Sequence, residues 1–265
     1  MPHAIRIHAT GGPEVLRWED VGVGEPAPHE ARVRHAAVGL NFIDIYFRTG
    51  LYPTPLPAGL GIEAAGVVEA VGSAVTEVKP GDTILIQAAA GGVGLIVCQW
   101  AKALGATVIG TVGSDDKAAL ARAHGCDHPI VYSRENFTQR VREITGGAGV
   151  PVVYDSIGKD TFTGSLDCLR PLGMMVSFGN SSGPVPPVDL LELGKRGSLF
   201  ITRPSLMTYT AKRPDLLASA QELFAMVDSG RVRIEVNQTY ALKDAAQAQI
   251  DLAARKTTGS TVLLP

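Results

Sequence analysis

Short runs of alternating apolar and polar residues fill the first part of the chain. AIRIHA, ARVRHAAVG and AAGVVEAVG have the period-two pattern of half-buried β-strands, and Gly- and Pro-rich stretches such as Gly11–Pro13, Pro26–Pro28 and Tyr52–Pro55 separate them. The segment NFIDIYFR, which begins at Asn41, fits either one helical turn or a loop with inward aromatic side chains. This pattern predicts a β-domain over residues 1–82.

From Thr83 the pattern changes to strands that alternate with helices. TILIQ is a continuous apolar run of the kind found in buried parallel strands, and GLIVCQWAKALG follows it with helical spacing and a glycine stop. The runs ATVIGTV, HPIVY, VPVVYDSIG, GMMVSFG and SLFITR predict further strands, and DDKAALARAHG, NFTQRVREITGG, TFTGSLDCLRPLG and PDLLASAQELFAMVDSG predict helices. Residues 83–236 are therefore expected to form an α/β domain, a Rossmann-type doubly wound parallel sheet. In the tail, VRIEVN and STVLLP predict strands around a helix, LKDAAQAQIDLAA.

A glycine cluster lies where the first of these buried strands meets its helix. Ala90–Gly94 reads AGGVG, and glycine lets a backbone turn tightly and approach a pyrophosphate, which the N-terminus of the following helix attracts. An ordinary tight turn between strand and helix is the alternative. The buried strand before the cluster, the helix after it and the strand beyond favour dinucleotide binding.

The end of the next strand indicates which dinucleotide is expected. NAD sites usually place Asp or Glu there, about 20 residues after the glycines, to bind the ribose 2′-hydroxyl. Here the strand ends Val112–Ser114 with Lys117 just beyond, and a small neutral residue with a cation suits the 2′-phosphate of NADP(H). Asp115 and Asp116 would oppose a phosphate if they pointed inward, and Lys117 has the alternative of a solvated lysine on a helix face.

Composition narrows the class of protein. The 265 residues are 45% hydrophobic and 19% charged with a net charge of −2, which is typical of a globular protein. Lys and Arg do not cluster, so nucleic acid is not an expected partner. We see no signal-peptide pattern and no window of roughly 20 apolar residues that could span a membrane, and we expect a cytoplasmic protein. Cys98, Cys126 and Cys168 fit neither a disulfide framework nor a metal clip and are expected to be buried thiols.

Seven motifs together give the chain a specific resemblance. They are VGLNFIDIYFRTGLY, GIEAAGVVEAVG, AAAGGVGLIVCQWAKALGATVIGTVGS, VVYDSIGKDT, LDCLRPLGMMVSFGNSSGPV, GSLFITRPSL and KTTGSTVLLP. With them the chain resembles the zinc-independent quinone oxidoreductases of the medium-chain dehydrogenase/reductase superfamily, the zeta-crystallin-like group. The resemblance implies a GroES-like β-domain over residues 1–82, completed by residues 237–265, in addition to the Rossmann domain over 83–236. It also implies NADPH as the cofactor, with quinones or related conjugated carbonyls as substrates.

The zinc ligands of related enzymes are missing from the sequence. Zinc-dependent relatives have a His before the Glu of a GHExxG motif and a Cys where this chain has Asn41. Here Ile62 precedes Glu63, and the 6 His residues are scattered. We therefore expect no metal, so that catalysis depends on positioning the acceptor and on polar groups that stabilise a developing oxyanion.

The resemblance assigns site residues motif by motif. On the substrate side it implies Asn41, Tyr46 and Tyr52, whose amide and hydroxyl groups could hydrogen-bond a quinone oxygen. The alternatives are that both tyrosines are core aromatics and that Asn41 is a turn residue. Arg203 and Arg255, which the resemblance places at the cofactor, have the alternative of surface charges. The complete cofactor set is Gly91, Gly92, Val93, Gly113, Ser114, Lys117, Tyr132, Ser156, Phe178, Gly179, Asn180, Arg203 and Arg255.

The chain departs from the family pattern at one junction, Val78–Asp82. Relatives have two PGD-like turns with β-domain strands and a helical hinge between them, whereas here a single Lys79–Asp82 turn stands for both. Roughly sixty residues, enough for several strands and a helix, are therefore expected to be absent. This truncation would remove the strand partners of AIRIHA and AAGVVEAVG and expose sheet edges.

The sequence thus predicts a zinc-free, NADPH-dependent quinone oxidoreductase, with a reductase of α,β-unsaturated carbonyls as the nearest alternative. The truncation leaves a second alternative open, an NADPH-binding protein with weak catalysis or none. The resemblance also implies a homodimer, in which GSLFITR would be an edge strand that pairs across a two-fold axis. The alternative for GSLFITR is an interior strand.

Overall fold

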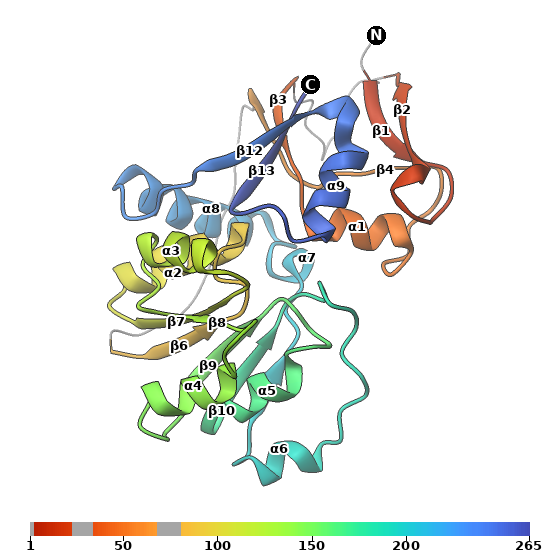
Figure 1. The fold of residues 1–265 in the computed structure, drawn as a ribbon. Coiled ribbons are helices and arrows are strands. Elements are labelled where there is room, and N and C mark those ends of the chain that lie inside the picture. Colours follow the sequence, from red (N-terminus) through yellow and green to blue (C-terminus); the bar gives the residue numbers. More distant parts are fainter. Residues whose placement is uncertain (1–2, 23–33, 68–80) are drawn as a thin grey trace. The chain divides into compact units, whose positions relative to one another are not determined.

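The computed structural model describes residues 3–22, 34–67 and 81–265. It divides into two compact units, one made of Met1–Ala70 with Glu235–Pro265 and the other of Val71–Ile234 (Figure 1). No helix within these described ranges is both long enough and apolar enough to cross a membrane.

The Val71–Ile234 unit is built on a six-stranded sheet whose pairings are all parallel. The strand order is β11-β10-β9-β6-β7-β8, so the chain moves outward from β6 to β8 and then returns to add β9, β10 and β11 on the other side. This is the doubly wound order of a Rossmann fold, and the predicted fold class is confirmed. The strands are β6 (Thr83–Ile86), β7 (Thr107–Val112), β8 (His128–Val131), β9 (Val150–Asp155), β10 (Leu169–Ser177) and β11 (Phe200–Thr202).

Helices cover both faces of this sheet. Because side chains alternate along a strand, Ile84 and Ile86 of β6 pack into one apolar cluster while Leu85 packs into another. The first cluster includes residues of α2 (Gly92–Ala103) and α3 (Asp115–Ala123), and the second includes residues of α4 (Phe137–Ile144) and α5 (Phe162–Asp167). A strand buried on both faces has no polar side, which explains the continuous apolar run TILI.

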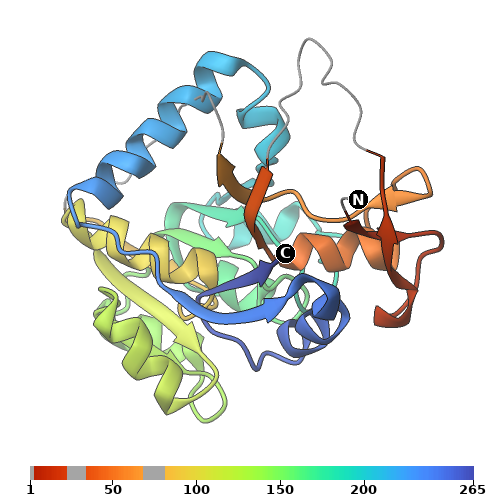
Figure 2. The ribbon, with the colours of Figure 1, turned by 90° about the horizontal axis from the view of Figure 1, so that it is seen from above.

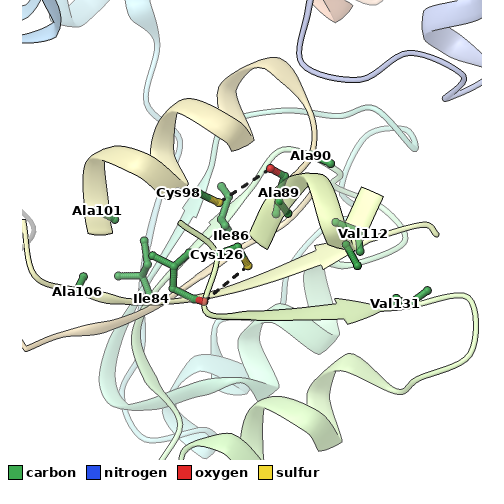
Figure 3. Packing of buried hydrophobic residues seen from close by; sticks show 13 residues of the cluster. Ile84, Ile86, Ala89, Ala90, Cys98, Ala101, Ala106, Val112, Cys126 and Val131 are labelled. Atoms are coloured by element: carbon green, nitrogen blue, oxygen red, sulfur yellow. Dashed lines mark hydrogen bonds between the residues drawn. The ribbon is translucent and has the colours of Figure 1, made fainter. Parts of the chain in front are cut away.

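The three cysteines are buried and unbridged, as predicted. Figure 3 shows Cys98 and Cys126 in the first cluster, where their thiols point to the carbonyl oxygens of Ala89 at 4.0 Å and Val108 at 3.7 Å. Burial raises the pKa of the Cys168 thiol to about 12. These thiols pack as small apolar groups.

Several elements of this unit differ from the prediction. The run TFTGSLDCLRPLG was expected to be one helix, but α5 ends at Asp167 and β10 begins at Leu169. Pro171 cannot continue a helix, and Leu172 has φ +59°, where the pairing of β10 with β9 shifts register. Two short helices were not predicted, α6 (Leu191–Lys195) and α7 (Leu206–Tyr209), whereas the amphipathic run near the end of the unit forms α8 (Arg213–Asp228).

The other unit joins the two ends of the chain. Its four-stranded sheet has the order β12-β13-β3-β5, with β13 antiparallel to β3, so N- and C-terminal segments lie side by side (Figure 2). A three-stranded sheet has the order β2-β1-β4. The elements are β1 (His3–Ile7), η1 (Pro13–Val15), β2 (Leu16–Asp20), β3 (Arg34–Gly39), α1 (Phe42–Thr49), β4 (Ala58–Gly59), β5 (Ala64–Val67), β12 (Val236–Ala241), η2 (Leu242–Asp244), α9 (Ala245–Ala253) and β13 (Ser260–Leu264).

The helices and strands of this unit differ in part from those expected from the sequence. The run NFIDIYFR forms a helix, α1, and the predicted strand VRIEVN begins only at Val236. AIRIHA was expected to lack strand partners, but β1 pairs with β2 on one side and with β4 on the other. These partners come from LRWED and from a two-residue strand, neither of which has an alternating apolar pattern.

The expected truncation lies at the edge of what the structure describes. β5 pairs with β3 through Ala64–Val67, so AAGVVEAVG keeps one strand partner. Residues 68–72 of that run lie outside the described residues. So do Val78–Pro80 of the expected junction, of which Gly81 and Asp82 are described.

Candidate functional site

The predicted glycine turn connects β6 to α2. Gly91 is the N-cap of α2, and its N–H donates to the Ala88 carbonyl at 3.0 Å. A Cβ atom on Gly94 would lie 2.3 Å from that same carbonyl oxygen, so only glycine lets the helix pass this close to the turn. Val93 is 53% exposed in the first turn of the helix. The first N–H groups of a helix have no partner within the helix, and together with the helix dipole they form an anion site.

A second group of predicted residues surrounds the end of β7. Ser114 caps α3, with its hydroxyl oxygen accepting the Lys117 N–H at 3.3 Å. A Cβ atom on Gly113 would lie 2.9 Å from the hydroxyl oxygen of Tyr132, which shows that the tyrosine hydroxyl lies directly over this glycine. The structure thus brings Gly113, Ser114, Lys117 and Tyr132 together.

The charge of Asp115 in this group is paired. Arg134 holds both carboxylate oxygens, with Nη1–Oδ2 at 2.5 Å and Nη2–Oδ1 at 2.6 Å. This hydrogen bonding to Arg134 lowers the pKa of Asp115. Because the carboxylate faces an arginine, it opposes a nearby phosphate less than the sequence alone suggested.

A third group follows β9, β10 and β11. Gly179 packs so close to Ser156 that a Cβ atom on it would lie 2.4 Å from the Ser156 carbonyl oxygen. Arg203 is exposed, but its Nη1 donates to the carbonyls of Ser177 at 3.0 Å and Gly179 at 3.2 Å. With the Asn180 amide turned so that its oxygen accepts from Arg203 Nη2 at 3.1 Å, the guanidinium fixes this loop. Arg203 is therefore more than a solvated surface charge.

These three groups share one edge of the sheet. The glycine turn, the Gly113–Ser114 segment, Ser156 and Phe178–Asn180 each follow the carboxyl end of a parallel strand. In doubly wound sheets, ligands bind outside the carboxyl ends of the strands where the strand order reverses, which here lies between β6 and β9. The predicted cofactor residues of this unit therefore lie at the edge where a dinucleotide is expected.

Sequence reasoning missed a set of buried polar residues behind this edge. Gln87, Thr111, Ser165 and Asp155 are at most 2% exposed and are hydrogen-bonded to one another. The available signal was a polar residue at the end of two otherwise apolar strands, Gln87 after TILI and Asp155 after VPVVY.

The substrate-side residues lie in the other unit, with Asn41 at the start of α1, Tyr46 within it and Tyr52 just after it. Asn41 precedes the helix, its N–H donating to Asp44 Oδ2 at 2.9 Å and its Nδ2 donating to Glu63 Oε2 at 2.6 Å. The Glu63 contact shows that the Asn41 amide does more than form a local turn. A Cβ atom on Gly39 would lie 2.5 Å from Glu63 Cδ, so glycine at 39 leaves room for this carboxylate.

Tyr46 of this helix packs against Tyr52, which follows the helix. Tyr46 is 8% exposed, and its ring meets that of Tyr52 edge to face with centroids 5.3 Å apart. The Tyr52 N–H donates to the Tyr46 carbonyl at 3.1 Å. Both tyrosines thus have the packing of core aromatics, which is compatible with a wall for a flat ligand.

Arg255 also belongs to this unit, whereas the other cofactor candidates belong to the Val71–Ile234 unit. It follows α9 with φ +58°, is exposed, and its N–H donates to the Leu252 carbonyl.

Asp44 carries the clearest perturbed carboxyl group of this unit. It is 2% exposed, and burial raises its pKa to about 6, with the charge of Glu63 adding to the effect. The Asn41 N–H partly offsets this by stabilising the ionised form. Among the described residues, its Oδ1 atom has no hydrogen-bond partner.

Comparison with known proteins identifies the family. The alcohol dehydrogenase GroES-like domain matches residues 27–128, and the zinc-binding dehydrogenase domain matches residues 92–221. A quinone oxidoreductase of Pseudomonas aeruginosa is 48% identical, with 100% of both chains covered. The chain belongs to the quinone oxidoreductase family of the medium-chain dehydrogenase/reductase superfamily. The resemblance noted in the sequence is thereby confirmed.

Two further relatives are a reductase and an enzyme whose structure contains NADPH. A 2-haloacrylate reductase of a Burkholderia species is 42% identical over 100% of this chain and 99% of that protein. The crystal structure of Escherichia coli quinone oxidoreductase complexed with NADPH superposes with a TM-score of 0.94 at 42% identity, covering 100% of both chains. Despite the zinc-binding name of one domain, no three His, Cys, Asp or Glu side chains gather as a metal site in the described ranges.

The alignments also bear on chain length. The Pseudomonas aeruginosa protein aligns over 325 positions, whereas this chain has 265 residues, so at least 60 aligned positions hold no residue of this chain. This agrees with the length of the expected truncation. Its position at Val78–Asp82 stays a prediction.

Proposed function

We propose that this chain is an NADPH-dependent, zinc-free quinone oxidoreductase. The observation that carries the proposal is the group at the end of β7, where Gly113, Ser114, Lys117 and Tyr132 meet while Arg134 pairs with the nearby Asp115. A small residue, a cation and a hydroxyl suit a 2′-phosphate, and Asp115, one of the two carboxylates that could oppose it, is paired. The named activity of relatives at 42–48% identity supports the same reading.

The residues present fit the cofactor. The backbone at Gly91, Gly92 and Val93 would hold the pyrophosphate at the start of α2, since a Cβ atom on Gly94 would close the turn. Lys117 and Tyr132 would bind the 2′-phosphate, with Gly113 and Ser114 beside it. Ser156, Phe178, Gly179, Asn180, Arg203 and Arg255 complete the proposed set. When bound, NADPH supplies the hydride that reduces the substrate.

On the substrate side we assign Asn41, Tyr46 and Tyr52. The Asn41 amide gives one N–H to Glu63, and its second N–H is a donor that can hold a quinone oxygen as negative charge develops there. Amide and hydroxyl donors can stabilise the negative charge that develops on the acceptor oxygen, so its stabilisation does not require a metal ion. A conjugated carbonyl offers the same oxygen, and the similarity to a 2-haloacrylate reductase favours such acceptors as the alternative substrates.

We further infer the organisation of the chain. The catalytic domain would comprise residues 1–82, shortened at Val78–Asp82 and completed by residues 237–265, and the NADPH-binding domain would comprise residues 83–236. β11 pairs only with β10 among the described strands, and its Phe200 is 55% exposed, which supports a homodimer built by pairing β11 across a two-fold axis. A cytoplasmic location is part of the same proposal. A monomeric mass by light scattering would contradict the dimer.

The test combines binding and turnover. Titration of the chain with NADPH, followed by cofactor fluorescence, measures affinity, and quinone-dependent oxidation of NADPH measures activity. The proposal expects saturable binding together with turnover. The shortened length favours one other candidate, an NADPH-binding protein without catalysis. Tight binding with no oxidation of NADPH by any quinone or enone would establish that candidate instead.

A further inference from the structure

A chain of buried hydrogen bonds runs beneath the carboxyl ends of β7, β6 and β9. We call Thr111, Gln87, Ser165 and Asp155 the switch-point network. Thr111 Oγ1 donates to Gln87 Oε1 at 2.5 Å, Gln87 Nε2 donates to Ser165 Oγ at 2.9 Å, and Ser165 Oγ donates to Asp155 Oδ2 at 2.8 Å. The four side chains are 2%, 1%, 0% and 0% exposed in that order.

The direction of every bond in the network is fixed. Asp155 accepts four hydrogen bonds, from Ser165, from the Thr161 hydroxyl at 2.7 Å, and from the N–H groups of Ile157 and Gly158 at 2.8 and 3.0 Å. Because Ser165 gives its only proton to Asp155, it must accept from the Gln87 amide. The Gln87 oxygen then faces the hydroxyl of Thr111.

Both ends of the network hold loops of the proposed cofactor site. At one end, the Ala88 N–H of the glycine turn donates to Thr111 Oγ1 at 3.3 Å. At the other end, Asp155 holds the turn that contains Ser156. The Ser156 turn also binds the loop that follows β10. The Phe178 N–H donates to the Asp155 carbonyl at 2.8 Å, and the Ser181 N–H donates to the Ser156 carbonyl at 3.2 Å.

Stability alone does not explain a polar network at this place. Removing amide, hydroxyl and carboxyl groups from water is unfavourable, and well-packed apolar side chains of similar volume are often as stable or more so. A hydrogen-bonded network with only one allowed arrangement fixes the position of each loop that it binds, which apolar packing does not do.

We propose that the switch-point network is a positioning device for the cofactor. It fixes the spacing between the glycine turn at one end and the Ser156 and Phe178–Asn180 loops at the other. It thereby sets the affinity for the pyrophosphate and nicotinamide half of NADPH, while the 2′-phosphate half depends on Lys117 and Tyr132. This role rests on the proposed NADPH-binding function.

The test uses the substitution Gln87→Met, which keeps similar volume and removes both central hydrogen bonds. Affinity is measured for NADPH by fluorescence titration and for adenosine 2′-monophosphate, which carries the 2′-phosphate and no part of the pyrophosphate, by calorimetry. Gln249→Met is the matched control, because Gln249 is likewise buried, at 2% exposed, but lies outside the network. We expect Gln87→Met to raise the Kd for NADPH about tenfold, the effect of one lost hydrogen bond to the ligand, and the Kd for adenosine 2′-monophosphate less than twofold.

The outcomes separate the proposal from the proposed function. An unchanged NADPH affinity in Gln87→Met, or an equal loss for both ligands, would overturn the positioning role while leaving NADPH as the cofactor. A wild-type chain that binds neither ligand would contradict the cofactor and the role together. If Gln87→Met does not fold, Ser165→Ala cuts the network at its next link and is expected to show the same split between the two ligands.

Discussion

The substitution Gly94→Ala tests the geometry of the glycine turn most directly. An added Cβ atom would lie 2.3 Å from the Ala88 carbonyl oxygen and 2.8 Å from the Ala89 backbone. Ordinary contact begins near 3.4 Å, and the contacting atoms are backbone, so α2 and the turn must separate by about 1 Å. Overpacking of this kind costs about 1–3 kcal/mol. Since each kcal/mol shifts Tm by about 2–4 °C in a domain of 150–250 residues, Tm should fall by roughly 2–12 °C.

The same displacement moves the N–H groups that would hold the pyrophosphate. A hydrogen bond to a charged group contributes about 1.5–3 kcal/mol, so the Kd for NADPH should rise by at least about tenfold. Thermal unfolding and NADPH fluorescence titration measure the two effects. Gly194→Ala is the control, because this helical glycine has open space around its Cβ position. A Gly94→Ala variant with the Tm and Kd of wild type would refute the reasoning.

Three further predictions concern single side chains. Lys117→Ala should raise the Kd for NADPH about tenfold and leave the Kd for NADH within about threefold, measured by parallel titrations; equal losses would remove Lys117 from the 2′-phosphate. Glu63→Gln should lower kcat for quinone reduction about tenfold without changing the Kd for NADPH, because a neutral partner orients and polarises the Asn41 amide less; an unchanged kcat would show that the 2.6 Å contact is only structural. Asp44 is buried with its pKa raised to about 6, so the folded state binds more protons than the unfolded state between about pH 4 and 6, and stability falls as pH rises through that window. Urea unfolding of Asp44→Asn from pH 4 to 7.5 should therefore show roughly 2–3 kcal/mol less pH dependence than wild type, and equal curves would contradict the raised pKa.

The sequence predicted the parallel-sheet unit well because its strands are buried on both faces. Such strands read as continuous apolar runs, and TILI and ATVIGTV could be assigned without tertiary information. The LRPLG segment was mistaken for helix because Leu169 and Leu172 continue the apolar spacing. Pro171 disfavours a helix there, and the segment forms part of β10 with a bulge. In the other unit, β2 and β4 were missed because neither has an alternating pattern, and they form by pairing with β1.

The candidate site was predictable only where it follows strand ends. Glycines and polar residues after β6, β7, β9 and β10 could be placed together from topology alone. The pairing of Asp115 with Arg134 and the contact between Asn41 and Glu63 join residues 19 and 22 positions apart, and no local pattern encodes them. The switch-point network depends on the order of β7, β6 and β9 in the sheet, which single-residue reasoning does not supply.

The central claim is that this 265-residue chain reduces quinones with NADPH and without zinc. The most direct measurement follows NADPH oxidation by the purified chain, its length verified by intact mass, with a quinone present and a metal chelator added. The account predicts oxidation that requires both chain and quinone, is faster with NADPH than with NADH, and is unaffected by the chelator. Loss of activity on chelation, or NADPH binding with no oxidation by any quinone, would contradict it.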